Sequence, residues 1–509
     1  MKLIKALFSR LVIVGVILFL QVFYFIVMLN RIGNYSTIVH YIFLTISILV
    51  VLYIVNKSDN SSYKLAWIIP ILSFPVFGGV LYLAMGDKKP ARKMRHKLEL
   101  VGEKTNCLLS QKKEIMEEIE AKNPYVAGQA KYLTNTVNFP IYKNTETKYY
   151  SSGEAYFESL LLELKKSKHF IFMEYFIVEE GEMWGAILEI LEQKAKEGLD
   201  VRFMYDDVGC VSLLPYQYTK QLEKKGIKSI AINPYRPIFS VAMNNRDHRK
   251  ITVIDGNVGF TGGVNLADEY INRKVRFGHW KDTGIMLKGE AVFSLTVMFL
   301  QMWNANRDTD SDFSKFYPNY YEKQTYDVPG YVLPYGDTPL DCEATGENVY
   351  LHMINTATKY VYICTPYLII DSEMMNALCL AAKRNVDIRI ITPGIPDKKI
   401  VFKVTRSYYP QLMSAGVKIY EYTPGFIHAK CVVVDDEIAT VGTINFDYRS
   451  LYLHFENGIY MYQTETVKCV KDDLLETIEK CHEMKKEDMK QGLFRDLFGE
   501  VLRLFAPMM

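Results

Sequence analysis

One residue pattern occurs twice, far apart in the chain, and it limits the possible folds more than any other feature of the sequence. The pattern is His-x-Lys, four residues that are nearly all apolar, and Asp. Its two copies are His248, Lys250 and Asp255, and then His428, Lys430 and Asp435. A repeated pattern with the same internal spacing predicts two structurally similar halves.

Each copy is followed, after six further residues, by a Gly-x-x-Asn tail. The first tail contains Gly263 and Asn265, and the second contains Thr443 and Asn445. Glycine allows the backbone to approach a ligand closely, and asparagine supplies an amide that can hydrogen-bond it. The four residues between Lys and Asp have the length and composition of a buried strand. Together the two copies bring two imidazoles, two ammonium groups and two amides, a set that suits an anionic phosphodiester.

These motifs resemble those of the phospholipase D superfamily, whose members hold two such motifs at a pseudo-twofold axis. The similarity covers roughly residue 125 to the C-terminus, and the apolar N-terminal region narrows it to the bacterial cardiolipin synthases. The resemblance implies an α/β fold, with two pseudo-symmetric α/β/α sandwich halves behind an N-terminal membrane-helix region. It implies no metal and no cofactor.

Further repetition outside the motifs supports two halves. Residues 168–173 parallel 359–364, residues 195–202 parallel 382–389, and residues 221–234 parallel 411–424. In both halves the order is helix, strand, helix, strand and motif strand, which predicts a largely parallel or mixed sheet in each. The expected divisions are a transmembrane region (1–87), a charged connector (88–130), a first half (131–325), a second half (326–490) and a C-terminal amphipathic helix (491–509).

Composition limits which binding partners and which cellular compartment are expected. A net charge of +2 argues against a broadly basic nucleic-acid binder, so no nucleic-acid partner is expected. The eight Cys include no C-x-x-C pair, which indicates neither a zinc ribbon nor a disulfide framework. Reduced thiols fit a catalytic part that faces the cytoplasm.

Three apolar runs near the N-terminus predict a multi-pass protein of the cell membrane. They cover residues 11–29, 38–55 and 65–85, each close to the length of about 20 residues that a bilayer crossing needs. A basic cluster at residues 88–97 places the end of the third run in the cytoplasm, but the basic residues at 2–10 also favour a cytoplasmic N-terminus. Three full crossings cannot satisfy both. The first run could also be a signal peptide, although no A-x-A-like site follows it.

Two other segments are expected near lipid. Residues 235–247 have no counterpart in the second half and form either a loop that admits acyl chains or a surface excursion. Residues 493–505 place their apolar side chains on one face of a short helix, which either packs on the core or lies in the membrane interface.

The resemblance also assigns roles to the motif residues. It makes His248 the nucleophile that attacks phosphorus and His428 the general acid, which then acts as a base towards the acceptor alcohol. Lys250 and Lys430 would clamp the non-bridging oxygens. The remaining substrate contacts would come from the motif tails, through Gly263, Asn265, Thr443 and Asn445.

Carboxylates complete the expected site. By resemblance, Asp255 and Asp435 belong to the catalytic motifs and mostly anchor the motif strand and its Lys, while later carboxylates orient the imidazoles. Glu456, twenty-eight residues after His428, is expected to orient His428, and Asp282 is the expected counterpart for His248. The other seven His have no motif context, although His279 and His454 lie near the orienting acids.

The resemblance implies a cardiolipin synthase that transfers a phosphatidyl group between two phosphatidylglycerol molecules in the membrane through a phosphohistidine. The alternatives are a hydrolytic phospholipase D, a transferase with another head-group alcohol, a membrane-bound nuclease and a catalytically idle scaffold. The expected partners are phosphatidylglycerol and membrane lipid, and a homo-oligomer is possible.

Overall fold

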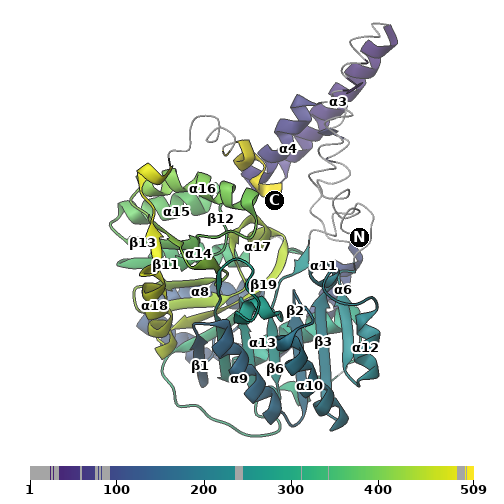
Figure 1. The fold of residues 1–509 in the computed structure, drawn as a ribbon, viewed down its shortest axis with the longest axis vertical. Coiled ribbons are helices and arrows are strands. Elements are labelled where there is room, and N and C mark those ends of the chain that lie inside the picture. The colour runs from purple at the N-terminus through teal and green to yellow at the C-terminus, as the bar shows by residue number, and fades with distance from the viewer. Residues whose placement is uncertain are drawn as a thin grey trace. The chain divides into compact units, whose positions relative to one another are not determined.

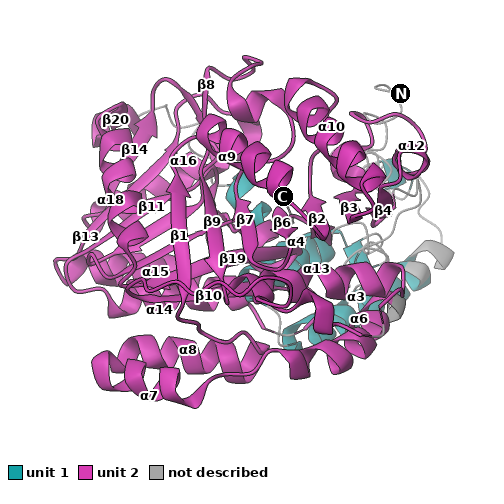
Figure 2. Ribbon diagram, turned by 90° about the horizontal axis from the view of Figure 1, so that it is seen from below, with its two compact units in different colours: residues 1–89, 238–242, 501–509 teal, residues 90–237, 243–500 magenta. Residues whose placement is uncertain are grey.

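A computed structural model describes residues 34–57, 60–74, 92–234, 245–310, 312–341, 343–489 and 501–508, together with residues 23, 24, 27, 78, 79, 82 and 499. The chain divides into two compact units, shown in different colours in Figure 2. Unit 1 comprises residues 1–89, 238–242 and 501–509, and unit 2 comprises residues 90–237 and 243–500. Both His-x-Lys motifs therefore belong to unit 2.

Unit 1 is built on α3 (Asn34–Asn56) and α4 (Ser61–Ser73), which pack together through a small apolar cluster that includes Ile54 and Trp67. The short helix η6 (Ala506–Met508) packs on α4. Over the residues that the structure describes, no helix combines the length and the apolar character that a membrane crossing needs. The crossing expected at 38–55 is therefore not supported. The run at 65–85 is described only in part, and the run at 11–29 lies almost wholly outside the described residues.

The first half of unit 2 contains a mixed seven-stranded sheet (Figure 1). Its strands β2, β3 and β4 are parallel, and the others join it antiparallel. In spatial order the strands are β1 (Thr145–Tyr150), β9 (Gly284–Gly289), β7 (Val258–Gly262), β6 (Ile251–Ile254), β2 (Phe170–Tyr175), β3 (Asp200–Asp206) and β4 (Lys228–Ile232).

The second half repeats this order and adds one strand at its edge. Its main path is β10 (Tyr331–Asp337), β19 (His454–Tyr462), β17 (Ile438–Gly442), β16 (Cys431–Val434), β11 (Tyr360–Cys364), β13 (Asp387–Pro393), β14 (Lys418–Tyr422) and β20 (Cys481–Glu483). The motif strands β6 and β16 occupy equivalent positions and are buried throughout. The repeated strands and the mixed sheets predicted from the sequence are thus confirmed.

Most of the helices follow the same repeat. The first half has α9 (Gly153–Lys166), α10 (Glu182–Lys196), α11 (Asp207–Cys210), α12 (Tyr218–Lys224) and α13 (Val292–Asn306); the second has α14 (Thr345–Thr356), α15 (Ser372–Lys383), α16 (Lys399–Ser414), α17 (Tyr448–Tyr452) and α18 (Glu465–Ile478). Three helices precede them, α6 (Arg92–Thr105), α7 (Lys113–Lys122) and α8 (Pro124–Val137). Because α6 packs on α13 and α8 packs on α14, the charged stretch expected to be a connector is part of unit 2.

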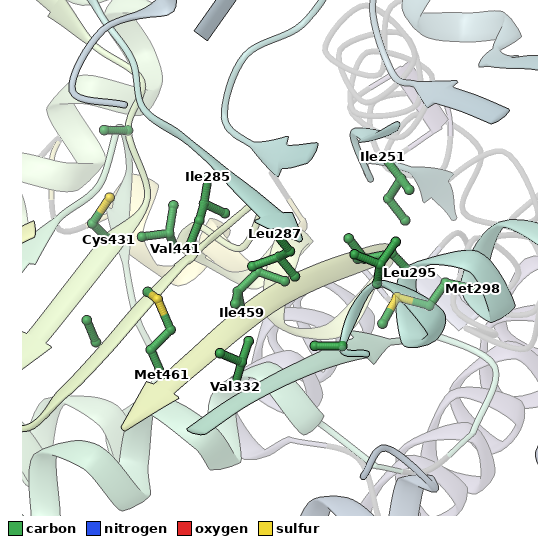
Figure 3. Packing of buried hydrophobic residues seen from close by; sticks show 14 of the residues in the cluster. Ile251, Ile285, Leu287, Leu295, Met298, Val332, Cys431, Val441, Ile459 and Met461 are labelled. Atoms are coloured by element: carbon green, nitrogen blue, oxygen red, sulfur yellow. The ribbon is translucent and has the colours of Figure 1, made fainter. Parts of the chain in front are cut away.

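One large apolar cluster extends through both halves, and a second lies mainly in the first half. Figure 3 shows part of it, where Ile285 and Leu287 of the first sheet meet Val441, Ile459 and Met461 of the second. Helix α13 is apolar on all sides and almost completely buried, and it contacts β6 of its own half and β10 of the other. Its counterpart α18 contacts β16 of its own half and β1 of the other. The two halves therefore stabilise each other.

Two short parallel strand pairs join the halves beside the motifs. Strand β5 (Arg246–Asp247), which precedes the first motif His, pairs with β19 of the second half. Strand β15 (Gly425–Ile427), which precedes the second motif His, pairs with β8 (His279–Lys281) of the first half. This reciprocal pairing places each motif beside a strand of the other half.

Candidate active site

The backbone brings each motif histidine against the opposite half. The backbone N–H of His248 donates to the carbonyl oxygen of Phe455 over 2.9 Å, and the backbone N–H of His428 donates to the carbonyl oxygen of Lys281 over 2.7 Å. Each acceptor stands one residue before a candidate orienting carboxylate. Neighbouring strands lie about 4.8 Å apart, so a side chain on one reaches its neighbour on the other.

The carboxylates orient the imidazoles in the opposite pairing to the one predicted from the sequence. His248 Nδ1 lies 2.9 Å from Glu456 Oε1 and 3.0 Å from Oε2. His428 Nδ1 lies 2.8 Å from Asp282 Oδ2. The predicted pairing of Glu456 with His428 is wrong, because the motif strand and the carboxylate strand that meet side by side come from different halves.

The motif tails support these carboxylates. The hydroxyl of Thr443 donates to Glu456 Oε2. At the equivalent position of the first half, a Cβ on Gly263 would lie 2.0 Å from Asp282 Oδ1, so only glycine leaves room for this carboxylate. Asp282 also accepts the N–H of Thr283 at 2.8 Å. Gly263 and Thr443, expected to bind substrate, contact the groups that orient the imidazoles, and a substrate contact of either residue stays a prediction.

Both motif lysines are buried beside the histidines. Lys250 Nζ donates to the carbonyl oxygen of His248 at 2.5 Å, and Lys430 Nζ donates to that of His428. Their exposed fractions are 0% and 1%. Burial lowers the pKa of Lys250 to about 7 and that of Lys430 to about 8. A buried ammonium group is costly without an anion, so this site favours an anionic ligand.

The pKa values of the two imidazoles and of the two orienting carboxylates are also shifted by burial and by neighbouring charges. Burial and then the nearby Lys250 lower the pKa of His248 well below its usual range, and burial and then Lys430 lower that of His428 to about 4. Burial raises the pKa of Glu456 to about 8, whereas the pKa of Asp282 is lowered although burial opposes this, because His428 and Lys430 favour its charged form. The two imidazole–carboxylate pairs are therefore geometrically alike and electrostatically different.

Asp255 and Asp435 lie at the other end of the motif strands and do not contact the imidazoles. Asp255 accepts the N–H groups of residues 168–170, each at 2.8 Å. Asp435 accepts those of residues 358–360 at 2.7–2.8 Å. Both have a positive φ, 52° and 54°, in the turn that ends the motif strand. They anchor the motif strand to its neighbour, as the sequence predicts, but they do not contact the motif lysines.

The two motif asparagines differ in their contacts. Asn265 accepts the N–H of Ile177 at 3.0 Å and donates to the hydroxyl of Tyr270 at 2.8 Å, so its amide already joins two loops. A substrate contact of Asn265 stays a prediction, since these two hydrogen bonds use only one N–H of its amide. Asn445 Oδ1 is buried and accepts no hydrogen bond from the part of the chain that the structure describes. For Asn445 a substrate contact stays a prediction.

Several groups near the imidazoles are not evident from the motifs. The His454 ring lies 5.7 Å from the His248 ring, and the rings of Trp280 and Tyr270 lie 5.5 and 5.4 Å from that of His428. His454 and Trp280 each stand two residues before an orienting carboxylate, a spacing that places alternate residues of a strand on one face. Proximity to an orienting acid already singled out His454 in the sequence, and the same spacing could have identified Trp280.

A buried ion-pair network lies under the first motif. Arg249, between His248 and Lys250, donates to Glu174 Oε1 at 2.6 Å and to Asp247 Oδ1 at 3.0 Å. These three side chains are almost fully buried, so they fix the backbone that carries His248. Among the residues that the structure describes, no three His, Cys, Asp or Glu side chains are grouped so that they could hold a metal ion.

Comparison with protein families gives two matches. Residues 160–303 and 350–477 match the family described as "Cardiolipin synthase, PLD-like domain", and residues 44–86 match "Phospholipase_D-nuclease N-terminal". The first match includes both motifs and both orienting carboxylates.

Curated relatives match along most of the chain. A protein of Streptococcus mutans described as uncharacterized is 45% identical over 90% of this chain and 99% of its own length. Cardiolipin synthase 2 of Bacillus cereus is 36% identical over 89% of this chain and 88% of its own length. Among solved structures, the phosphatidylserine synthase of Haemophilus influenzae is similar, with a TM-score of 0.54 and 16% identity over 75% of this chain and 98% of that chain, which establishes a shared fold.

Proposed function

This chain belongs to the family of phospholipase D-like cardiolipin synthases, and from that premise we propose that it transfers a phosphatidyl group from one phosphatidylglycerol to another. The products are cardiolipin and glycerol. The observation that carries the proposal is the pair of imidazoles, each fixed through Nδ1 by a carboxylate and each beside a buried lysine.

The first half-reaction forms a covalent bond to histidine. A carboxylate at Nδ1 leaves Nε2 as the reacting nitrogen. His248 Nε2 attacks the phosphorus of the donor lipid, and the bond from phosphorus to the glycerol head group breaks. The bound phosphodiester anion raises the low pKa of His428, which then donates a proton to the departing alkoxide. The result is a phosphatidyl-histidine and free glycerol. Lys250 and Lys430 offset the charge on the non-bridging oxygens, and each charge-assisted hydrogen bond contributes about 1.5–3 kcal/mol.

The second half-reaction reverses these roles. His428 removes the proton from the terminal hydroxyl of a second phosphatidylglycerol, whose oxygen then attacks phosphorus and releases His248. If water attacked phosphorus in place of this hydroxyl, the product would be phosphatidate. Both imidazoles are almost fully buried, and such a site favours a bound lipid alcohol over bulk water.

We also propose that unit 1 associates the enzyme with the membrane and that unit 2 faces the cytoplasm. Helix α3 exposes a row of large apolar side chains, including Ile38, Ile42, Leu49 and Leu52, each more than half exposed. Such a surface marks a site of contact with lipid or protein. Resistance of the full chain to alkaline extraction from membranes supports lipid contact, and release into the soluble fraction contradicts it.

Purified full-length protein in phosphatidylglycerol vesicles, with a chelator present, tests the activity directly. We expect equal amounts of cardiolipin, measured by lipid mass analysis, and of glycerol, measured in the aqueous phase. His248→Ala and His428→Ala should each lower the rate by about 10²–10⁴-fold, because each removes a group that acts on the reacting atoms. Phosphatidate as the sole lipid product would identify a hydrolase instead.

A further inference from the structure

The two sides of the site differ in chemistry although their backbones are equivalent. One pleat before His248 and Glu456, the strand pair β5–β19 places Arg246 opposite His454. One pleat before His428 and Asp282, the strand pair β15–β8 places Phe426 opposite Trp280. Paired residues of neighbouring strands project from the same face. The strand pair on the His248 side is therefore basic, although Phe176 also lies 5.0 Å from the His248 ring, and the strand pair on the His428 side is aromatic.

A third residue strengthens the basic side. Arg449, in α17, donates from Nε to His454 Nε2 over 3.1 Å. A guanidinium group cannot accept a hydrogen bond, so His454 Nε2 is the acceptor and the ring proton resides on Nδ1. His454 Nδ1 is buried and has no partner among the described residues. The basic side thus presents a buried N–H donor that requires an acceptor.

The electrostatics of His454 agree with an anion site. Burial lowers its pKa well below the usual range, and the charges of Arg449, Lys250, Arg246 and Lys398 lower the pKa further. Four cationic side chains therefore act on one neutral imidazole. Arg246 already lies 3.6 Å from the carboxylate of Asp206 and donates to the carbonyl oxygen of Asn233 at 3.0 Å. An anion placed there would offset the remaining positive charge and accept the free N–H.

We propose that Arg246, Arg449 and His454 form a second phosphate subsite, which binds the phosphate of the acceptor phosphatidylglycerol. This inference rests on the proposed function, because the reaction brings two lipid phosphates together and the motif residues serve only the one that reacts. One pleat along a strand is about 7 Å, a length comparable to the glycerol bridge that joins the two phosphates of cardiolipin.

The test compares two acceptors in the same vesicles. With phosphatidylglycerol as the acceptor, the product is cardiolipin; with added 1-butanol, which carries no phosphate, the product is phosphatidylbutanol. Arg449→Gln and His454→Phe should each lower cardiolipin formation by about 10- to 100-fold, because each removes a hydrogen bond to a charged group. Formation of phosphatidylbutanol should be unchanged, and Arg449→Lys should retain part of the cardiolipin activity.

Arg307→Gln is the matched control, because Arg307 forms an exposed ion pair with Glu223 away from the motifs. It should leave both products unchanged. If the wild-type enzyme makes cardiolipin but Arg449→Gln loses both products equally, the subsite is overturned. The same holds if Arg449→Gln loses neither product. A wild-type enzyme that makes phosphatidylbutanol but no cardiolipin would overturn the proposed function, and the subsite with it.

Discussion

At the scale of single residues, Lys250 and Lys430 determine what the site binds. Both ammonium groups are buried, and their pKa values of about 7 and about 8 lie below the usual value for lysine. A bound phosphodiester anion favours their charged forms and raises both pKa values. Binding of the anion therefore takes up protons near neutral pH.

This linkage predicts the pH dependence of binding. As the pH rises through about 7 to 8, the free enzyme loses protons from Lys250 and Lys430, so its affinity for a non-reactive phosphodiester should fall. Calorimetric titration with a short-chain lipid phosphonate in two buffers of different ionisation heat measures both the affinity and the proton uptake. Lys250→Met should weaken both effects, and the surface substitution Lys225→Met should change neither. Affinity that is constant or rises over this range would refute the linkage.

Residue patterns predicted the imidazoles, the lysines and the orienting carboxylates, but not the partner of each carboxylate. Glu456 and Asp282 can be recognised by their distance from a motif, yet which histidine each contacts depends on strands that pair across the halves. Sequence spacing contains no information on that pairing.

At the scale of elements, the end of β7 must lie very close to the segment that follows β8. Gly263 allows this approach, because a Cβ there would lie 2.0 Å from Asp282 Oδ1 and 3.0 Å from the carbonyl oxygen of His428. The motif predicts a close approach at this glycine, but it predicts that the substrate, rather than Asp282, is the group that approaches. The apolar runs that became β6 and β16 were predicted correctly, because burial on both faces leaves a continuous apolar signature.

Gly263→Ala should therefore displace Asp282 and misplace His428. We expect kcat to fall by about 10²-fold, the scale associated with an atomic shift of about 1 Å in an active site. Gly128→Ala is the control, because Gly128 lies in α8 and an added Cβ there meets nothing within 4 Å. This control should retain full activity and gain up to about 1 kcal/mol of stability. Normal kcat in Gly263→Ala would contradict the proposed packing.

At the scale of the whole of unit 2, the two halves form one folding unit. The sequence predicts two halves, at residues 131–325 and 326–490, and their shared core could not be foreseen because it depends on how two sheets pack. Lys281 of the first half donates to Asp473 of α18 at 2.7 and 2.9 Å, and Tyr149 donates to the same carboxylate at 2.6 Å. The inserted loop at 235–247 lies mostly outside the described residues.

Asp473→Ala should destabilise both halves together. Removal of one partner from a buried ion pair costs about 3–5 kcal/mol, because Lys281 would remain buried without its counter-charge. We expect one unfolding transition at a lower temperature, followed by tryptophan fluorescence. Glu223→Ala, which breaks the exposed pair with Arg307, should cost less than about 1 kcal/mol. Two separate transitions would show that the halves unfold independently.

The central claim is that His248, oriented by Glu456, attacks phosphorus, while His428, oriented by Asp282, moves protons. A phosphatidyl ester of p-nitrophenol tests it most directly, because this leaving group departs without a proton and its release is visible. Asp282→Asn should release one equivalent of p-nitrophenol in a rapid burst and then stall, whereas Glu456→Gln should show no rapid burst. A burst in Glu456→Gln with none in Asp282→Asn would contradict this division of roles.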